Sequence, residues 1–178
     1  MSNTGIIYGV NGPVIYLKGD SGFKISEMVY VGPEHLVGEI IGLKKGMTTV
    51  QVFEETTGLK PGDTVTGTGD AISVLLGPGI IHNIFDGIQR PLEEIAKTSG
   101  KYISRGVSVD SLDTEKKWHT HITVKKGDVV GPGTIIAETQ ETASILHKSM
   151  VPPNITEGTV IKAAPDGDYT ILEPIVTI

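Results

Sequence analysis

The sequence is dominated by β-branched side chains that are interrupted at short intervals by glycine and proline. Valine and isoleucine together number 39 and threonine 19, whereas leucine and alanine together number only 16. Two heavy atoms on Cβ restrict χ1 and suit these residues to extended backbone rather than to helices. Because 23 glycines and 10 prolines are available for turns, we expect these 178 residues to fold mainly into short β-strands.

Residues 1–70 contain a series of short apolar runs separated by turn sequences. In the turns Asn11-Gly12-Pro13 and Lys60-Pro61-Gly62-Asp63, proline presets φ and glycine is free to adopt a positive φ. About six strands fit into this length, and closing them into a barrel would remove the exposed strand edges. We therefore predict a small closed β-barrel over residues 1–70. The expected strands are residues 5–10, 14–17, 28–31, 37–43 and 48–53.

The pattern changes between residues 71 and 104, where apolar residues recur at helical spacing over residues 80–88. Pro91 is well placed to begin a second helical segment, because the first turn of a helix does not need its N–H. We therefore predict a short helical connector over residues 71–104, with an apolar face that packs on a partner. The contact candidates on that face are Ile80, Ile84, Phe85 and Ile88.

Residues 105–178 return to the strand pattern, which we predict to form a barrel-sandwich-like β domain. Within it, residues 143–178 are similar to the fold of biotinyl and lipoyl carriers. In those carriers a lysine at a hairpin tip receives the prosthetic group, and Lys148 is the nearest candidate. Pro152 and Pro153 follow directly and cannot donate to a strand ladder, so we expect no modification. A carrier or a stand-alone binding module is the alternative function. The expected strands are residues 118–124, 133–138, 143–150, 158–163 and 169–178.

Composition excludes several classes of protein. The chain has no cysteine, which excludes disulfides, thiolate catalysis and cysteine-ligated zinc. A formal net charge of −6 argues against sequence-independent nucleic-acid binding. No apolar run approaches the roughly 18 residues of a membrane span, and no signal peptide is visible. We therefore expect a soluble, cytoplasmic chain that neither binds nucleic acid nor inserts directly into a membrane.

The candidate chemical sites are few. His119 and His121 share one face if their segment is a strand, and His147 or Glu138 could supply a third metal ligand. A half-exposed polar strand explains the pair equally well, so we expect no metal site. The chain contains no G-x-x-x-x-G-K-[ST], G-x-G-x-x-G, H-E-x-x-H or G-x-S-x-G. We therefore predict no catalytic residue, no nucleotide-binding residue and no cofactor for this chain.

One long motif has a family resemblance. Residues 74–92, VLLGPGIIHNIFDGIQRPL, resemble the catalytic A subunit of V-type and archaeal-type rotary ATPases. Further segments match in order along the whole chain. They are Gly12-Pro13-Val14, residues 37–41 and 51–59, Arg105-Gly106-Val107 with Leu112-Asp113, and Met150-Val151-Pro152 before Gly158-Thr159-Val160. Thr120 departs from the family, which more often has an aromatic residue after the position of Trp118.

The resemblance implies an assembly role. In the family, the N-terminal barrel forms a ring with neighbouring subunits, and residues 105–178 correspond to a bulge insertion. The implied partners are B subunits in an alternating hexamer and stalk subunits at the bulge, in a complex peripheral to the membrane. The parent subunit would hydrolyse or make ATP, coupled to H⁺ or Na⁺ transport. Its P-loop lies beyond Ile178 in the family, so ATP and Mg²⁺ belong to a nucleotide-binding domain absent from this chain.

Overall fold

The computed structural model describes residues 3–19, 21–81, 83–100 and 102–178, which form two compact units. The barrel unit consists of Met1–Val74 and Ile95–Ser108, and the sandwich unit consists of Leu75–Glu94 and Val109–Ile178. The connector predicted over residues 71–104 is therefore divided between the two units.

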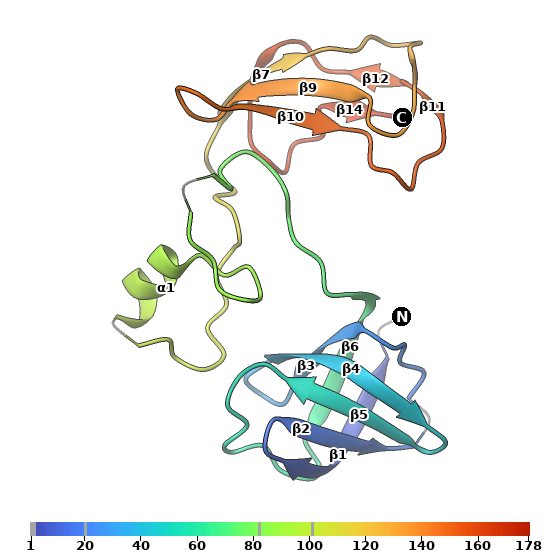
Figure 1. Cartoon of the computed structure of the whole chain (residues 1–178), viewed down its shortest axis with the longest axis vertical. Coiled ribbons are helices and arrows are strands. Elements are labelled where there is room, and N and C mark those ends of the chain that lie inside the picture. Colours follow the sequence, from blue (N-terminus) through green and yellow to red (C-terminus); the bar gives the residue numbers. More distant parts are fainter. Residues whose placement is uncertain (1–2, 20, 82, 101) are drawn as a thin grey trace. The chain divides into compact units, whose positions relative to one another are not determined.

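The barrel unit is built on six antiparallel strands that close on themselves (Figure 1). Their order around the barrel is β1-β2-β5-β4-β3-β6, and β6 pairs back to β1. This arrangement confirms the predicted closed barrel. The strands are β1 (Thr4–Asn11), β2 (Val14–Lys18), β3 (Glu27–Val31), β4 (Leu36–Lys44), β5 (Met47–Val52) and β6 (Thr64–Ala71).

The barrel interior is filled by alternate residues of each strand. In β2, for example, Ile15 and Leu17 are fully buried, whereas the residues between them are not. Fully burying an aliphatic side chain of this size contributes about 1.5–3 kcal/mol. This core therefore provides the main stabilisation of the barrel. The cluster contains Ile7, Ile15, Leu17, Phe23, Val29, Val31, Leu36, Ile40, Val50, Val52 and Val65.

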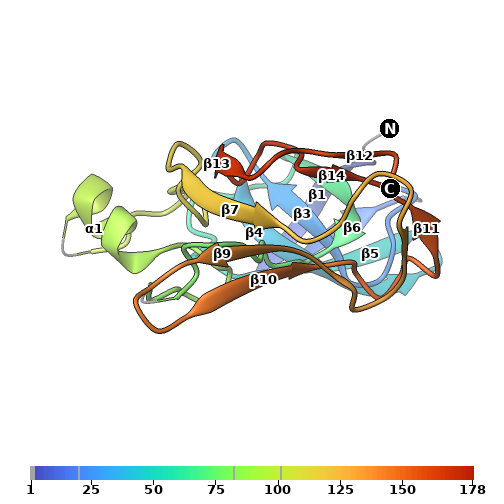
Figure 2. The same ribbon diagram turned by 90° about the horizontal axis from the view of Figure 1, so that it is seen from above.

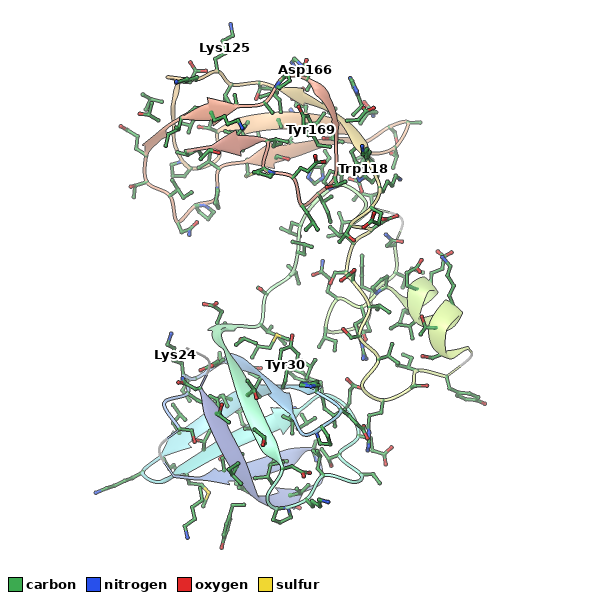
Figure 3. All side chains as sticks on the ribbon, turned by 180° about the vertical axis from the view of Figure 1, so that it is seen from behind. Lys24, Tyr30, Trp118, Lys125, Asp166 and Tyr169 are labelled. Carbon is green, nitrogen blue, oxygen red and sulfur yellow. The ribbon has the colours of Figure 1, made fainter. Side chains whose placement is uncertain are left out.

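Among the described residues of the barrel unit, one charged residue is buried. Glu27 is only 1% exposed, and its two carboxylate oxygens accept hydrogen bonds from the backbone N–H groups of Lys24 (2.8 Å) and Gly69 (2.9 Å). Figure 3 shows Lys24 near β3 and β6. A Cβ atom on Gly67 would overlap Glu27 Oε1 and would lie 2.8 Å from Phe23 Cε1. Glycine at position 67 therefore makes room for the buried carboxylate.

The sandwich unit contains a four-stranded antiparallel sheet in the order β10-β9-β7-β13 (Figures 1 and 2). Two short pairs, β8 with β11 and β12 with β14, complete it. Val124, Val130, Val151 and Val160 form its buried core. The strands are β7 (Trp118–Ile122), β8 (Val129–Val130), β9 (Ile135–Gln140), β10 (Leu146–Met150), β11 (Gly158–Thr159), β12 (Lys162–Ala163), β13 (Gly167–Tyr169) and β14 (Val176–Thr177).

Two of the strands predicted for this region are interrupted. Over residues 158–163 the chain changes partner, because Val160 N–H donates to Asp128 and Ile161 N–H donates to Thr177. Over residues 169–178 a turn intervenes, in which Glu173 accepts a hydrogen bond from Thr170 N–H (2.7 Å). Pro174 then lacks the N–H needed to continue a ladder. The paired segments are accordingly shorter than predicted.

The described residues contain a single helix, α1 (Leu92–Ser99), which follows Pro91 as predicted. Its acidic first turn and Lys97 in the last turn match the helix dipole, and Ile95 is its buried residue. The helix predicted over residues 80–88 is wrong, because the described residues there form turns and an isolated bridge. Gln89 adopts φ 62°, and a residue before proline, here Arg90, is disfavoured in the helical region.

Candidate functional site

The segment of residues 75–91, here called the apolar loop, is closed by the side chain of Gln89. Its amide oxygen accepts a hydrogen bond from Leu75 N–H, and its amide nitrogen donates to Leu75 C=O, each at 2.6 Å. Gln89 is only 8% exposed, so these bonds are shielded from water. The two ends of the loop are thereby held together, as paired strand residues would be.

Asp86 organises the far end of the apolar loop. Its Oδ1 accepts hydrogen bonds from the N–H groups of Ile88 (3.0 Å) and Arg90 (2.9 Å), and its Oδ2 contacts Arg90 Nε at 2.8 Å. Burial acts to raise the pKa of Asp86, but the hydrogen bonds and the charge of Arg90 outweigh it and leave the pKa lowered. The carboxylate thus holds residues 86–90 in a turn, and this turn is incompatible with a helix at these positions.

The lowered pKa of Asp86 gives a titration test. A carboxyl group whose pKa is lowered on folding stabilises the fold at neutral pH, and this contribution is lost as the pH falls below about 4. We expect Arg90→Ala to move the ¹³C NMR titration midpoint of Asp86 upward. Arg105→Ala is the control, because Arg105 pairs with Glu34 in the other unit. An unchanged Asp86 midpoint in Arg90→Ala would contradict the assignment.

The apolar loop is anchored to the sheet of the sandwich unit by Glu141, which directly follows β9. Glu141 Oε1 accepts hydrogen bonds from the backbone N–H groups of Gly79 and Ile81, both at 2.8 Å. Its side chain is 2% exposed, and Oε2 lies 3.3 Å from His147 Nδ1, an ion-pair contact without hydrogen-bond geometry. Gly79 has φ +103°, and a Cβ there would lie 3.3 Å from Trp118 Cζ2. Glycine therefore permits the close approach.

A cavity of about 160 Å³ lies between the apolar loop and the inner face of the four-stranded sheet. Its walls include Leu75, Leu112 and Trp118, and the hydroxyls of Thr120 and Thr139 bond each other beneath it at 3.0 Å. Figure 3 shows Trp118 and Tyr169 on this unit, where they are cross-strand partners in β7 and β13. The Trp118 indole nitrogen is shielded from solvent and has no hydrogen-bond partner.

The predicted contact residues do not form one helical stripe. Ile80, Phe85 and Ile88 are half-buried in the apolar loop, whereas Ile84 is 72% exposed. Leu76, which the sequence analysis did not select, is equally exposed at 72%. The outward apolar surface of this loop is therefore formed by Leu75, Leu76, Ile81 and Ile84.

In the barrel unit, Arg105 fastens the segment after α1 to the barrel. Its guanidinium donates to both Glu34 carboxylate oxygens (2.5 and 2.6 Å) and to Thr57 C=O, and it holds the pKa of Glu34 below its usual range. Gly106 N–H donates to a Glu54 carboxylate oxygen at 2.9 Å. Outside these contacts, the barrel presents exposed apolar residues. They include Ile6 and Tyr8 on β1, and Ile41 and Leu43 on β4.

The two histidines singled out in the sequence lie side by side on the outer face of β7. His119 Nδ1 lies 2.8 Å from Asp168 Oδ1, and His121 Nδ1 lies 2.6 Å from Asp166 Oδ2. The hydrogen bond and the charge of Asp166 raise the pKa of His121. His147, one expected third ligand, is paired across strands with Thr139, a buried residue of the inner face. Glu138 lies opposite His121.

Lys148 lies within β10 rather than at the tip of a hairpin. Its cross-strand partner is Glu138, and Lys148 Nζ lies 3.6 Å from Glu138 Oε1. The turn between β9 and β10 falls instead at residues 141–145. The position of Lys148 thus differs from that of a carrier lysine.

Two general properties of the described part of the chain bear on function. Within it, no group of three or more histidine, cysteine or acidic side chains is arranged to hold a metal ion. None of its helices is both long enough and apolar enough to cross a membrane.

Sequence reasoning missed the side chains that position the apolar loop and the segment after α1. Gln89, Glu141 and Arg105 bond residues that are 14 to 71 positions away, so no local pattern marks them. Asp86 did carry a signal, because Asp-Gly is typical of turns and an aspartate bonds backbone N–H groups shortly after it.

Two family profiles match the chain. Residues 7–69 match the ATP synthase alpha/beta family, beta-barrel domain. Residues 109–178 match the ATPsynthase alpha/beta subunit barrel-sandwich domain. The second match confirms the barrel-sandwich fold predicted for the C-terminal region.

Curated relatives match over essentially the whole chain. The V-type ATP synthase alpha chain of Halothermothrix orenii is 49% identical over 178 residues, which is 100% of this chain and 30% of that protein. The V-type alpha chain 2 of Clostridium tetani is 50% identical over 177 residues, covering 99% of this chain and 30% of that protein. The A subunit of the A-type ATP synthase of Methanopyrus kandleri is 47% identical over 180 residues, with coverages of 100% and 30%.

The chain thus spans less than a third of the length of these relatives. Two domain profiles of one family match the chain in the expected order, and about half of the residues are identical to those of a V-type ATP synthase alpha chain. These findings confirm the resemblance seen in the sequence. The chain therefore belongs to the ATP synthase alpha/beta family and corresponds to the β-barrel and barrel-sandwich region of the A subunit, or alpha chain, of V-type and A-type ATP synthases.

Proposed function

We propose that this chain is the assembly portion of the catalytic subunit of an ion-translocating V/A-type ATP synthase. The observation that carries the proposal is the identity of 49% over all 178 residues to a V-type ATP synthase alpha chain. In this proposal the parent subunit makes or hydrolyses ATP, coupled to H⁺ or Na⁺ movement. The 178 residues supply subunit contacts on the cytoplasmic side, peripheral to the membrane.

The barrel unit contributes the ring contact in this proposal. Its core is complete, yet Ile6, Tyr8, Ile41 and Leu43 on the outer surface are between 43% and 58% exposed. Because β1 and β4 are three strands apart in both directions around the barrel, these residues form two separate apolar groups on opposite sides of it. Exposed apolar groups are typical of interaction sites, and a subunit in a ring has two neighbours. The proposed partners are the barrels of adjacent B subunits in an alternating hexamer.

The sandwich unit contributes a second contact, to stalk subunits of the same complex. The supporting feature is its exposed apolar residues away from the apolar loop, of which Val129 and Ile161 are 66% and 63% exposed. The net charge of −6 also agrees with protein partners better than with a nucleic acid.

ATP and Mg²⁺ are bound outside this chain in this proposal. The described residues contain no group of three or more histidine, cysteine or acidic side chains that could hold a metal ion, and the sequence has no phosphate-binding loop. The described residues therefore provide neither a binding site suited to Mg²⁺ nor one suited to the phosphates of ATP.

The ring contact is testable in the full-length protein co-expressed with its B subunit. We expect Tyr8→Asp and Ile41→Asp each to weaken hexamer formation at least tenfold, because each places a charge in an apolar interface. Native mass spectrometry at graded protein concentrations measures the effect. Val129→Asp is the matched control, since it puts the same charge on the sandwich unit. Hexamers as stable as wild type in both barrel variants would refute the ring contact.

A further inference from the structure

The outer face of β7 carries two imidazoles in a form suited to metal binding. His119 and His121 are two residues apart on one strand, so both side chains leave the same face of the sheet. Their side chains are 78% and 62% exposed, which leaves them accessible to an ion from solvent.

Each imidazole is oriented by its own carboxylate. Asp168 is the cross-strand partner of His119 in β13, and Asp166, just before β13, bonds His121. Asp166 is itself fixed, because its Oδ1 accepts a hydrogen bond from Ile122 N–H at 2.8 Å. Figure 3 shows Asp166 beside β7.

This pairing determines which ring nitrogen is available. A carboxylate can only accept, so in the neutral imidazole the proton sits on Nδ1, which donates it, and Nε2 keeps its lone pair. A histidine that donates one N–H to a carboxylate while the other nitrogen binds a metal is the usual arrangement at metal centres. Here the arrangement occurs twice on adjacent outward positions of one strand.

We propose that His119 and His121 form a two-histidine site for a late first-row divalent transition-metal ion. The two Nε2 atoms are the protein ligands, Asp168 and Asp166 hold the rings from behind, and water completes the coordination. Imidazole ligands favour Cu²⁺, Ni²⁺ and Zn²⁺ over Mg²⁺, and Cu²⁺ is expected to bind most tightly.

Two other groups on this part of the sheet do not add to the ligand set. Glu138 lies opposite His121 in β9, but its carboxylate contacts Lys148 Nζ at 3.6 Å. His147 is engaged with Glu141 at the apolar loop. The site thus has two protein ligands, and its affinity depends on both histidines.

The test is a titration of the 178-residue chain with Cu²⁺, followed by calorimetry and by electron paramagnetic resonance. We expect one equivalent to bind with a two-nitrogen imidazole signature. His119→Asn and His121→Asn should each weaken binding at least tenfold, and Asp166→Asn about tenfold through the lost orientation of the ring. His147→Asn is the control and should bind as wild type does. Because the substituted side chains of the first three variants are exposed, circular dichroism should show an unchanged fold.

Equal Cu²⁺ affinity in wild type, His119→Asn and His121→Asn would overturn the proposal. A loss confined to His147→Asn would overturn it as well, because it would place the ion at the apolar loop. A single-nitrogen signature in wild type would show that the two rings do not bind one ion together, and would also count against it.

Discussion

Gly67→Ala is expected to destabilise the barrel unit by about 3 kcal/mol, since it overpacks the site and disturbs buried hydrogen bonds. The new methyl group would overlap Glu27 Oε1 and press on Phe23 Cε1. Glu27 cannot move without breaking its bonds to Lys24 N–H and Gly69 N–H. Urea unfolding followed by NMR signals of the barrel unit measures the change.

Gly9→Ala is the matched control for this substitution. Gly9 also lies in a barrel strand, but a Cβ there meets no atom within 4 Å. We expect it to change the free energy of unfolding by less than about 0.5 kcal/mol. Equal free energies of unfolding for Gly67→Ala and Gly9→Ala would contradict the close packing of Gly67 against the Glu27 carboxylate.

Glu141→Ala is expected to release the apolar loop from the sandwich unit. The substitution leaves the N–H groups of Gly79 and Ile81 without their acceptor. The cost is about 1–3 kcal/mol for the partly buried Gly79 N–H, whereas the exposed Ile81 N–H can bond water instead. Amide hydrogen exchange at these two positions should accelerate at least tenfold. Trp118, the only tryptophan of the chain and 8% exposed, should report the release by a red shift of its fluorescence.

Two further variants distinguish the loss of the Glu141 hydrogen bonds from the loss of a negative charge on this part of the sheet. Glu141→Gln keeps an acceptor oxygen and removes the charge next to His147, so we expect a smaller loss than with alanine. Glu138→Ala removes a carboxylate from the outer face of β9 and should leave Trp118 fluorescence unchanged. Protected Gly79 and Ile81 amides in Glu141→Ala would contradict the anchoring role.

The barrel was predictable because its determinants are local. A period-two pattern sets the inward residues, and turn sequences set the strand ends. Asn11-Gly12-Pro13 is an example, since Gly12 adopts φ 57° between paired β1 and β2. The buried position of Glu27 was not predictable in the same way. One of its oxygens accepts a hydrogen bond from Gly69 N–H, which is 42 residues away in the sequence and comes close to Glu27 only when the barrel is formed.

The apolar loop shows where the periodicity argument fails. Isoleucines at helical spacing arise in this segment without a helix, because Asp86 and Pro91 impose a turn that competes with it. The side chains that hold the loop in place are distant from it in the sequence. Glu141, for example, accepts a hydrogen bond from Gly79 N–H, 62 residues before it. No single-sequence pattern contains such a contact.

The pairing of β1 with β6 has a consequence for how the barrel is synthesised. One edge of β1 pairs with β2, but the other edge pairs with β6, where Thr4 is opposite Thr66. This second edge therefore stays unpaired until 62 further residues have been synthesised. At a translation rate of about 5–20 residues per second, this delay is roughly 3–12 s. During that time β1, which carries Ile6 and Tyr8, presents an open edge to other nascent chains. We therefore expect association of nascent chains through the open edge of β1, and we expect slower translation before residue 64 to increase it.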